Sequence, residues 1–288
     1  MTVVPDIARA RLSLEGLSLG DSFGDLFFSR SSETRSLATL PAYPWRWTDD
    51  THMALSILEV LEKFGGIDQD ALAQAFARRF AEEPWRGYAR GAMALLRQIR
   101  YGADWRTAAQ ALFKGGSYGN GAAMRAAPIG GCFWRDPARA ASEAQRSAVV
   151  THAHPEGQAG AMAVAAAAAL AAQAAPPTGR EFLRAVLPHV PDGLTRDGIE
   201  RAMELRGDQL PDAIERLGTG MRVSAQDTVP FCLWSAAYHL QDFEEAMWWT
   251  VSGHGDSDTT CAIVGGIVAL SAARLPAAWL ERREPLQP

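Results

Sequence analysis

Two short acidic strings are the residues best suited to chemistry in this 288-residue sequence. Residues 47–51 read WTDDT and residues 255–260 read GDSDTT. Each string combines two carboxyl groups with hydroxyl groups and comes just before an apolar stretch with helical spacing. Neighbouring carboxylates repel each other, and either the free N–H groups of a helix start or a bound cation relieves that repulsion. Each string taken alone therefore fits a helix N-cap as well as it fits a metal site.

Two such strings in one chain favour a metal site over a pair of caps. Together they offer four carboxylates and several hydroxyl oxygens. Mg²⁺ and Mn²⁺ prefer oxygen ligands, whereas zinc prefers Cys or His. We therefore predict one or two Mg²⁺ or Mn²⁺ ions as the cofactor.

A glycine-rich segment is the third candidate. Residues 115–125 read GGSYGNGAAMR. Because glycines let backbone N–H groups approach a ligand closely, the segment fits an anion or phosphate cradle. The GK[ST] ending of a P-loop is missing, and no predicted strand precedes the segment, as a dinucleotide-binding fingerprint would require. An ordinary glycine-rich turn is the alternative interpretation.

Two further strings carry weaker signals. Residues 151–154 read THAH, and no third nitrogen or sulfur ligand lies near them in the sequence. A histidine that donates a hydrogen bond to a phosphate or ribose is therefore favoured over a histidine metal site. Residues 20–25 read GDSFGD and predict a glycine-bounded helical turn, in which Asp21 either braces a site or caps the turn.

Helices must position these strings, because apolar residues recur with helical spacing along almost the whole chain. Alternating strand patterns of useful length are hard to find, so we predict an all-α protein. The predicted helices cover residues 53–64, 70–80, 88–100, 104–114, 138–150, 158–175, 180–187, 195–205, 210–217, 230–239, 242–252 and 260–273. Residues 30–43 are rich in Ser and Thr and predict a loop over the site.

The best candidate linker between two domains is the proline-bounded segment 188–192 (PHVPD). The two acidic strings lie on opposite sides of this segment and make chemical sense only together. We therefore expect a single domain over residues 1–288.

Composition and charge restrict the kinds of partner that the protein is expected to bind and the cellular compartment in which we expect it. The formal net charge of -5 argues against nucleic acid as a partner, because phosphate binding needs a basic face. The alanine-rich run 159–172 is shorter than the roughly 20 residues that cross a bilayer, and it predicts a tightly packed internal helix. The three cysteines lie far apart, which fits a reducing compartment, and the first residues lack the apolar core of a signal peptide. We expect a cytoplasmic monomer without a membrane partner.

The ordered set of strings resembles the ADP-ribosylglycohydrolase family, also called the dinitrogenase-reductase-activating glycohydrolase family. GDSFG, WTDDT, GGSYGNGAAMR, THAH and GDSDTT carry the resemblance, from residue 20 to about residue 270. It implies a single compact multi-helix domain with a central metal cleft. It also implies a metal-dependent hydrolase that cleaves the glycosidic bond between ADP-ribose and an acceptor. The partner would be ADP-ribose itself, or a protein or small molecule that carries it on a group such as arginine or serine.

The resemblance also implies roles for individual residues. The implied metal ligands are Thr48, Asp49, Asp50, Asp256, Asp258 and Thr259. The implied substrate-binding residues are Gly116, Ser117, Tyr118, Gly119, Asn120, Gly121, Met124, Arg125 and His152. The implied catalytic residues are Asp49, Asp50 and Asp258. Glycosidic cleavage uses carboxylates as acid and base, and Asp49 or Asp50 is the predicted base that aligns a water molecule.

One position departs from the family pattern. Many members carry a glutamate a few residues after the GDxxG string, where this sequence has Phe28. A catalytically weakened ADP-ribose-binding protein of the same fold is therefore the alternative function. The SYGNG part of the glycine-rich segment looks closest to the branch that acts on O-linked ADP-ribose. The intact acidic strings argue against a purely structural protein, and the order of the strings argues against a Mg²⁺-dependent phosphohydrolase.

Overall fold

The structure is a computed structural model that describes residues 4–28 and 36–286. These residues form fifteen α-helices and three 3₁₀-helices and contain no β-strand, which confirms the predicted all-α class. The α-helices are α1 (Ile7–Asp25), α2 (Asp49–Phe64), α3 (Gln69–Glu82), α4 (Arg90–Arg100), α5 (Trp105–Ala111), α6 (Ala127–Cys132), α7 (Pro137–Val149), α8 (Pro155–Ala171), α9 (Gly179–Val186), α10 (Leu194–Ala202), α11 (Leu210–Leu217), α12 (Ala225–His239), α13 (Phe243–Val251), α14 (Ser257–Val268) and α15 (Ala277–Leu280). The 3₁₀-helices are η1 (Leu37–Thr39), η2 (Asn120–Ala122) and η3 (Leu187–His189).

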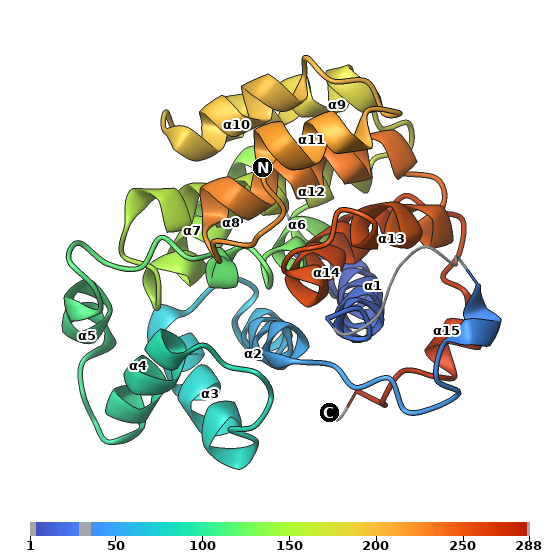
Figure 1. Cartoon of the computed structure of the whole chain (residues 1–288). Coiled ribbons are helices and arrows are strands. Elements are labelled where there is room, and N and C mark those ends of the chain that lie inside the picture. The colour runs from blue at the N-terminus through green and yellow to red at the C-terminus, as the bar shows by residue number, and fades with distance from the viewer. Residues whose placement is uncertain (1–3, 29–35, 287–288) are drawn as a thin grey trace.

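Helices α1 and α14 pack side by side in the middle of the molecule (Figure 1). Gly16, Gly20 and Gly24 recur every four residues and so share one face of α1. A Cβ atom on Gly20 would lie 2.1 Å from the Cys261 carbonyl oxygen, and one on Gly24 would lie 2.2 Å from the Ser257 carbonyl oxygen. Nothing larger than hydrogen fits there, so the three glycines set the distance between the two helices.

Helix α1 is the largest element that the sequence analysis missed. It spans 19 residues, whereas the sequence predicted a helical turn at residues 20–25. Glycine and serine are poor helix formers, which hid the helix from a reading based on propensity. Packing overrides propensity here, because small side chains allow the close contact with α14.

Both acidic strings lie in the first turn of a helix rather than before it. Helix α2 starts at Asp49 with Thr48 as its N-cap, and α14 starts at Ser257 with Asp256 as its N-cap. The predicted starts at residues 53 and 260 were therefore too late. Carboxylates complement the positive end of the helix dipole, so they extend these helices instead of preceding them. Their side chains are held by helical backbone.

The remaining helices surround this pair. Helix α8 runs through the interior, as its alanine content predicted, and residues 163–169 are all fully buried. Helices α9, α10 and α11 lie together at one end of the molecule, and α3, α4 and α5 lie together on another side (Figure 1). Short α6 and α15 were not predicted. Helix α12 begins before its predicted start at Pro230, which lies inside the helix with its ring against Gly198.

The last described residues close against the segment that leads into α2. The Trp45 N–H donates to the Arg282 carbonyl oxygen at 2.7 Å, and the Glu284 N–H donates to the Trp45 carbonyl oxygen at 2.8 Å. The ring of Trp279 stacks on Phe23 of α1 with 4.5 Å between centroids. Segments from both halves of the chain therefore pack around α1.

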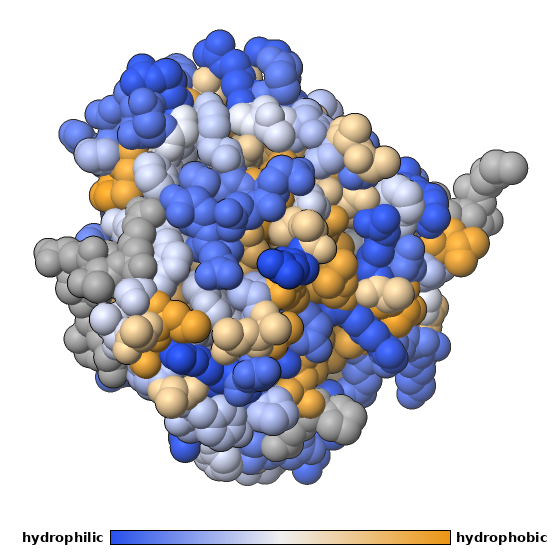
Figure 2. Space-filling view, turned by 90° about the vertical axis from the view of Figure 1, so that its right-hand side faces the viewer, coloured by the Kyte–Doolittle hydropathy of each residue, from blue (hydrophilic) through white to orange (hydrophobic). Residues whose placement is uncertain are grey.

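The surface is mixed in character. Figure 2 shows hydrophilic residues interspersed with smaller hydrophobic patches over one face. Across residues 4–28 and 36–286, no helix combines the length and the apolar character that crossing a membrane requires. Of the predicted loop at residues 30–43, residues 30–35 lie outside the described residues, and the remainder contains η1.

The contact between α1 and α14 leads to a test by single substitution. We expect Gly20→Ala to lower the free energy of unfolding by about 3 kcal/mol, because the added methyl group would overlap the Cys261 carbonyl oxygen. Urea unfolding followed by circular dichroism measures the change. Gly91→Ala in α4 is the matched control, since its methyl group would meet the ring of exposed Phe113 at 3.1 Å. Equal effects of the two substitutions would contradict the close contact.

Candidate metal centre and ligand cavity

Three carboxylates from three helices meet at one point. Asp21 comes from α1, Asp50 from α2 and Asp258 from α14, and one oxygen atom of each lies within 4.8 Å of the others. Asp21 and Asp50 are almost fully buried. Asp50 Oδ1 is buried and has no hydrogen-bond partner among the described residues. Three carboxyl groups therefore converge, and that of Asp50 has one oxygen atom without a hydrogen bond.

Asp21 is tied to the start of α2 by four hydrogen bonds. It accepts from the Thr48 N–H at 2.9 Å and the Thr48 hydroxyl at 2.9 Å. It also accepts from the Thr51 N–H at 3.1 Å and the Thr51 hydroxyl at 2.5 Å. The sequence analysis gave Asp21 a bracing or capping role and left it out of the metal ligands. Its place in the cluster makes Asp21 a further candidate metal ligand. The glycines that flank it in the sequence were the signal that could have indicated this role.

Burial and mutual repulsion disturb the ionisation of the carboxyl groups. Burial raises the pKa of Asp49 to about 7, and the negative charge of Asp21 adds to the effect. Burial raises the pKa of Asp21 to about 6 despite the hydrogen bonds that lower it. Burial, followed by neighbouring carboxylates, holds the pKa of Asp50 and of Asp258 well above the ordinary range, and burial raises the pKa of Asp256. The charge of Arg125 lowers the pKa of Asp49 by less than burial and the neighbouring carboxylates raise it, so the ionised cluster carries an excess of negative charge.

The donor set fits a hard divalent cation. The three converging groups are carboxylates, and the residues around them add threonine hydroxyls rather than sulfur or imidazole. The buried, unpartnered Asp50 oxygen is costly without a partner. A cation would both satisfy that atom and offset the repulsion, so the cluster can hold a metal ion.

A cavity of about 580 Å³ opens beside the cluster. All the predicted site residues line this cavity except Thr48 and Gly116. Thr48 lines a second, smaller cavity, and the backbone of Gly116 packs against Ala153 and His154. The structure thus brings together the two acidic strings, most of the glycine-rich segment and His152. The cavity has a size typical of small-molecule sites.

Asn120 connects the glycine-rich segment to the second acidic string. Its side-chain N–H₂ donates to Asp256 Oδ2 at 2.7 Å and to the Thr228 hydroxyl at 3.1 Å. These bonds use both hydrogens of the amide, so its oxygen remains for a ligand. The predicted substrate-binding role of Asn120 therefore coexists with a role in placing Asp256.

Arg125 holds the glycine-rich segment from behind. Its side chain is fully buried and lies over the ring of Phe76 at 4.5 Å. Nη1 donates to the Gly121 carbonyl oxygen at 2.7 Å, and Nη2 donates to the Thr151 hydroxyl at 2.8 Å. Burial lowers the pKa of Arg125 to about 9, which still leaves the guanidinium charged at neutral pH. Most of its donors bind the protein rather than a ligand.

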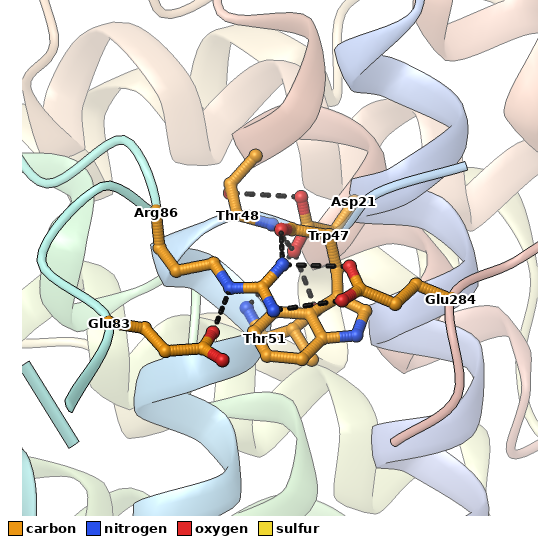
Figure 3. Close-up of polar contacts among 7 residues, drawn as sticks. All are labelled: Asp21, Trp47, Thr48, Thr51, Glu83, Arg86 and Glu284. Carbon is orange, nitrogen blue, oxygen red and sulfur yellow. Dashed lines mark hydrogen bonds and ion pairs between the residues drawn. The ribbon is translucent and has the colours of Figure 1, made fainter. Parts of the chain in front are cut away.

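A second network anchors the residue that precedes Thr48. In Figure 3, the Arg86 guanidinium lies over the ring of Trp47, at 3.5 Å from its centroid. Arg86 Nη1 donates to the Trp47 carbonyl oxygen at 3.1 Å, and carboxylates of Glu83 and Glu284 bind the rest of the guanidinium (Figure 3). The sequence analysis missed this network, since no spacing pattern connects its members. It fixes the main chain where α2 begins.

Comparison with known proteins identifies the family. A sequence model described as ADP-ribosylglycohydrolase matches residues 4–287. The chain belongs to the ADP-ribosylglycohydrolase family. The resemblance inferred from the five strings is therefore confirmed.

Relatives with detectable sequence identity extend along most of this ADP-ribosylglycohydrolase chain. An "Uncharacterized protein" of Archaeoglobus fulgidus is 30% identical over 239 residues, which cover 82% of this chain and 74% of the relative. ADP-ribosylhydrolase ARH3 of Homo sapiens is 26% identical over 329 residues, which cover 96% of this chain and 90% of the relative. A solved structure titled "ADP-ribosylglycohydrolase-related protein complex" has a TM-score of 0.66 at 22% identity, covering 96% of this chain and 94% of that one. This structural similarity concerns the ADP-ribosylglycohydrolase fold alone.

Repulsion in the cluster can be tested without a substrate. We expect Asp50→Asn to raise the melting temperature in EDTA by a few degrees, because the amide keeps the shape of the carboxyl group and removes a buried negative charge. The rise in melting temperature that Mg²⁺ or Mn²⁺ gives the unaltered protein should disappear in this variant. Scanning calorimetry measures both effects. Asp192→Asn, at a fully exposed carboxyl group, should change neither. A less stable Asp50→Asn protein in EDTA would count against the repulsion.

Proposed function

We propose that this chain is a metal-dependent ADP-ribosylhydrolase that cleaves the glycosidic bond between ADP-ribose and an acceptor. The observation that carries the proposal is the convergence of Asp21, Asp50 and Asp258 at the edge of a cavity of about 580 Å³. Family membership and the similarity to ARH3 proteins support the reaction class.

The two ends of the cavity lining suit the two parts of such a substrate. Residues 117–121 of the glycine-rich segment line the cavity together with Met124, Arg125 and His152, and we assign the diphosphate and the adjoining ribose to this part of it. We assign the scissile bond to the part of the cavity beside the acidic strings, whose proposed metal ligands are Thr48, Asp49, Asp50, Asp256, Asp258 and Thr259. Asn120 joins the two parts through its bond to Asp256.

Mg²⁺ or Mn²⁺ bound at the cluster supplies Lewis acidity, which orients sugar hydroxyls and lowers the pKa of water. The protein's own contribution is position. Asp49 is half-buried, lines the cavity and lies beside Gly87, so we assign it the role of aligning water for attack at the anomeric carbon. Asp21 holds the start of α2 in place through Thr48 and Thr51.

The reaction is tested by measuring ADP-ribose release from arginine-linked, serine-linked and acetyl-linked substrates with Mg²⁺, with Mn²⁺ and with EDTA. We expect release from at least one linkage and its loss in EDTA. Asp258→Ala should reduce metal-dependent release by about a hundredfold or more, because it removes one of the three converging carboxylates. Asp192→Asn should retain full activity. Undiminished release by Asp258→Ala would show that the cluster is not the catalytic centre.

A second candidate function is an ADP-ribose-binding protein with weakened catalysis. Phe28 favours it, because the resemblance aligns this position with the family's glutamate and a phenyl ring offers no acid or base. This function predicts that ADP-ribose raises the melting temperature while no substrate in the panel is cleaved.

Phe28→Glu separates the two functions. If Phe28 weakens catalysis, the restored carboxylate should raise the turnover number by about tenfold or more, as expected for a positioned acid or base. Phe28→Gln has a similar size without the charge and should not reproduce the gain. Turnover by the unaltered protein that neither substitution raises would contradict the weakened-enzyme interpretation.

A further inference from the structure

A chain of three polar side chains runs from the interior to the cavity. Arg125 Nη2 donates to the Thr151 hydroxyl at 2.8 Å, and that hydroxyl lies 2.7 Å from His152 Nδ1. Thr151 is 4% exposed and His152 is 9% exposed. All three residues line the cavity. The contacts are short and enclosed, so their donor and acceptor roles follow from hydrogen-bond balance.

The balance determines which histidine nitrogen carries the hydrogen. A guanidinium has donors and no acceptor, so the Thr151 oxygen must accept from Arg125. The hydroxyl has one hydrogen to donate, and His152 Nδ1 is the acceptor that the described residues offer it. An Nδ1–H would make the hydroxyl accept twice and leave its own hydrogen without a protein partner. Nδ1 is therefore bare. In a neutral imidazole the hydrogen then lies on Nε2.

Burial supports the neutral form of the ring. Burial lowers the pKa of His152 to about 3, and the positive charge of Arg125 adds to the effect. Arg125, with its pKa lowered to about 9, stays charged at neutral pH and is fixed by its bonds to Gly121 and Ser147. Arg125 acts only as a donor at the buried end of this row of hydrogen bonds. The Thr151 hydroxyl therefore donates onward to His152.

Nε2 of His152 faces the glycine-rich segment. A Cβ atom on Gly119 would lie 3.3 Å from Nε2, and one on Gly121 would lie 3.4 Å from it. The glycines leave this edge of the ring uncovered, and Nε2 has no protein partner among the described residues. The N–H is therefore available to an acceptor in the cavity.

We propose that Arg125 is a positioning residue that acts through Thr151 to fix His152 as a neutral Nε2–H donor for an oxygen atom of the ligand. The ligand atom is an acceptor oxygen of a phosphate or of a sugar hydroxyl. Its identification as part of ADP-ribose rests on the proposed function, whereas the tautomer of His152 does not.

The tautomer is measured directly in the ligand-free protein. Long-range ¹H–¹⁵N correlation spectra should show His152 with a bare Nδ1 and a protonated Nε2, unchanged from about pH 8 to about pH 5. The signals are assigned by their absence in His152→Gln. An Nδ1–H tautomer, or an imidazolium within this pH range, would overturn the proposal.

Thr151 offers a matched pair of variants. Thr151→Val keeps the shape and removes the hydroxyl, so the bare Nδ1 loses its donor and the single tautomer should give way to a mixture. We expect the Kd for ADP-ribose to rise about tenfold, which corresponds to about one hydrogen bond. Thr151→Ser restores the hydroxyl and should restore both the spectrum and the affinity. Equal behaviour of the two variants would overturn the role of the hydroxyl.

Two further measurements distinguish a lost hydrogen bond to the ligand from a change in metal binding, and identify which ligand oxygen accepts the bond. The rise in melting temperature on adding Mn²⁺ should be the same in both variants, because Thr151 lies outside the carboxylate cluster. Weaker binding of both ADP and ADP-ribose by Thr151→Val assigns the acceptor oxygen to the diphosphate, and weaker binding of ADP-ribose alone assigns it to the distal ribose. Failure of the unaltered protein to bind ADP-ribose would contradict the proposed function and the ligand assignment, while the spectra would still decide the tautomer.

Discussion

The close contact between α1 and α14 is the constraint on which the centre depends. Gly16, Gly20 and Gly24 allow the two backbones to approach until a methyl group would overlap a carbonyl oxygen. That approach brings Asp21 of α1 within reach of Asp258 of α14. A larger side chain at the contact would separate the two carboxylates as well as the helices. The same three glycines therefore determine both how closely the two helices pack and how closely the two carboxylates lie.

The proximity creates an electrostatic problem that the surrounding residues reduce without removing. Helix starts place positive dipole ends near the acids, and four hydrogen bonds stabilise the charge of Asp21. Even so, the pKa of Asp50 and of Asp258 stays well above the usual range because both groups are buried beside other carboxylates. Such a cluster relieves its repulsion either by keeping protons on some carboxyl groups or by binding a cation, which satisfies several acids at once.

Local sequence signals predicted which residues meet at the cavity better than they predicted the helices that bring them there. The two acidic strings, the glycine-rich segment and the alanine-rich interior helix were recognisable because their residue types are unusual and adjacent in sequence. Helix α1 was missed because its glycines oppose helix formation locally and favour it through contact with α14. Arg86 and Glu284 were missed because they meet across 198 residues, a separation that no spacing pattern reports. The sequence therefore reveals local groups, and long-range packing decides which of them converge.

The partnership of α1 and α14 also affects how the protein is made. The Ser13 hydroxyl donates to the Gly266 carbonyl oxygen across 253 residues, so α1 is completed by a helix that is synthesised much later. Until α14 has been made, α1 is a weak helix with an unpaired face, and Asp21 lacks its neighbour Asp258. The nascent chain must keep that face from other contacts, and folding that depends on such distant pairs is slow. The carboxylate cluster therefore forms only after α14 has been made and has packed against α1.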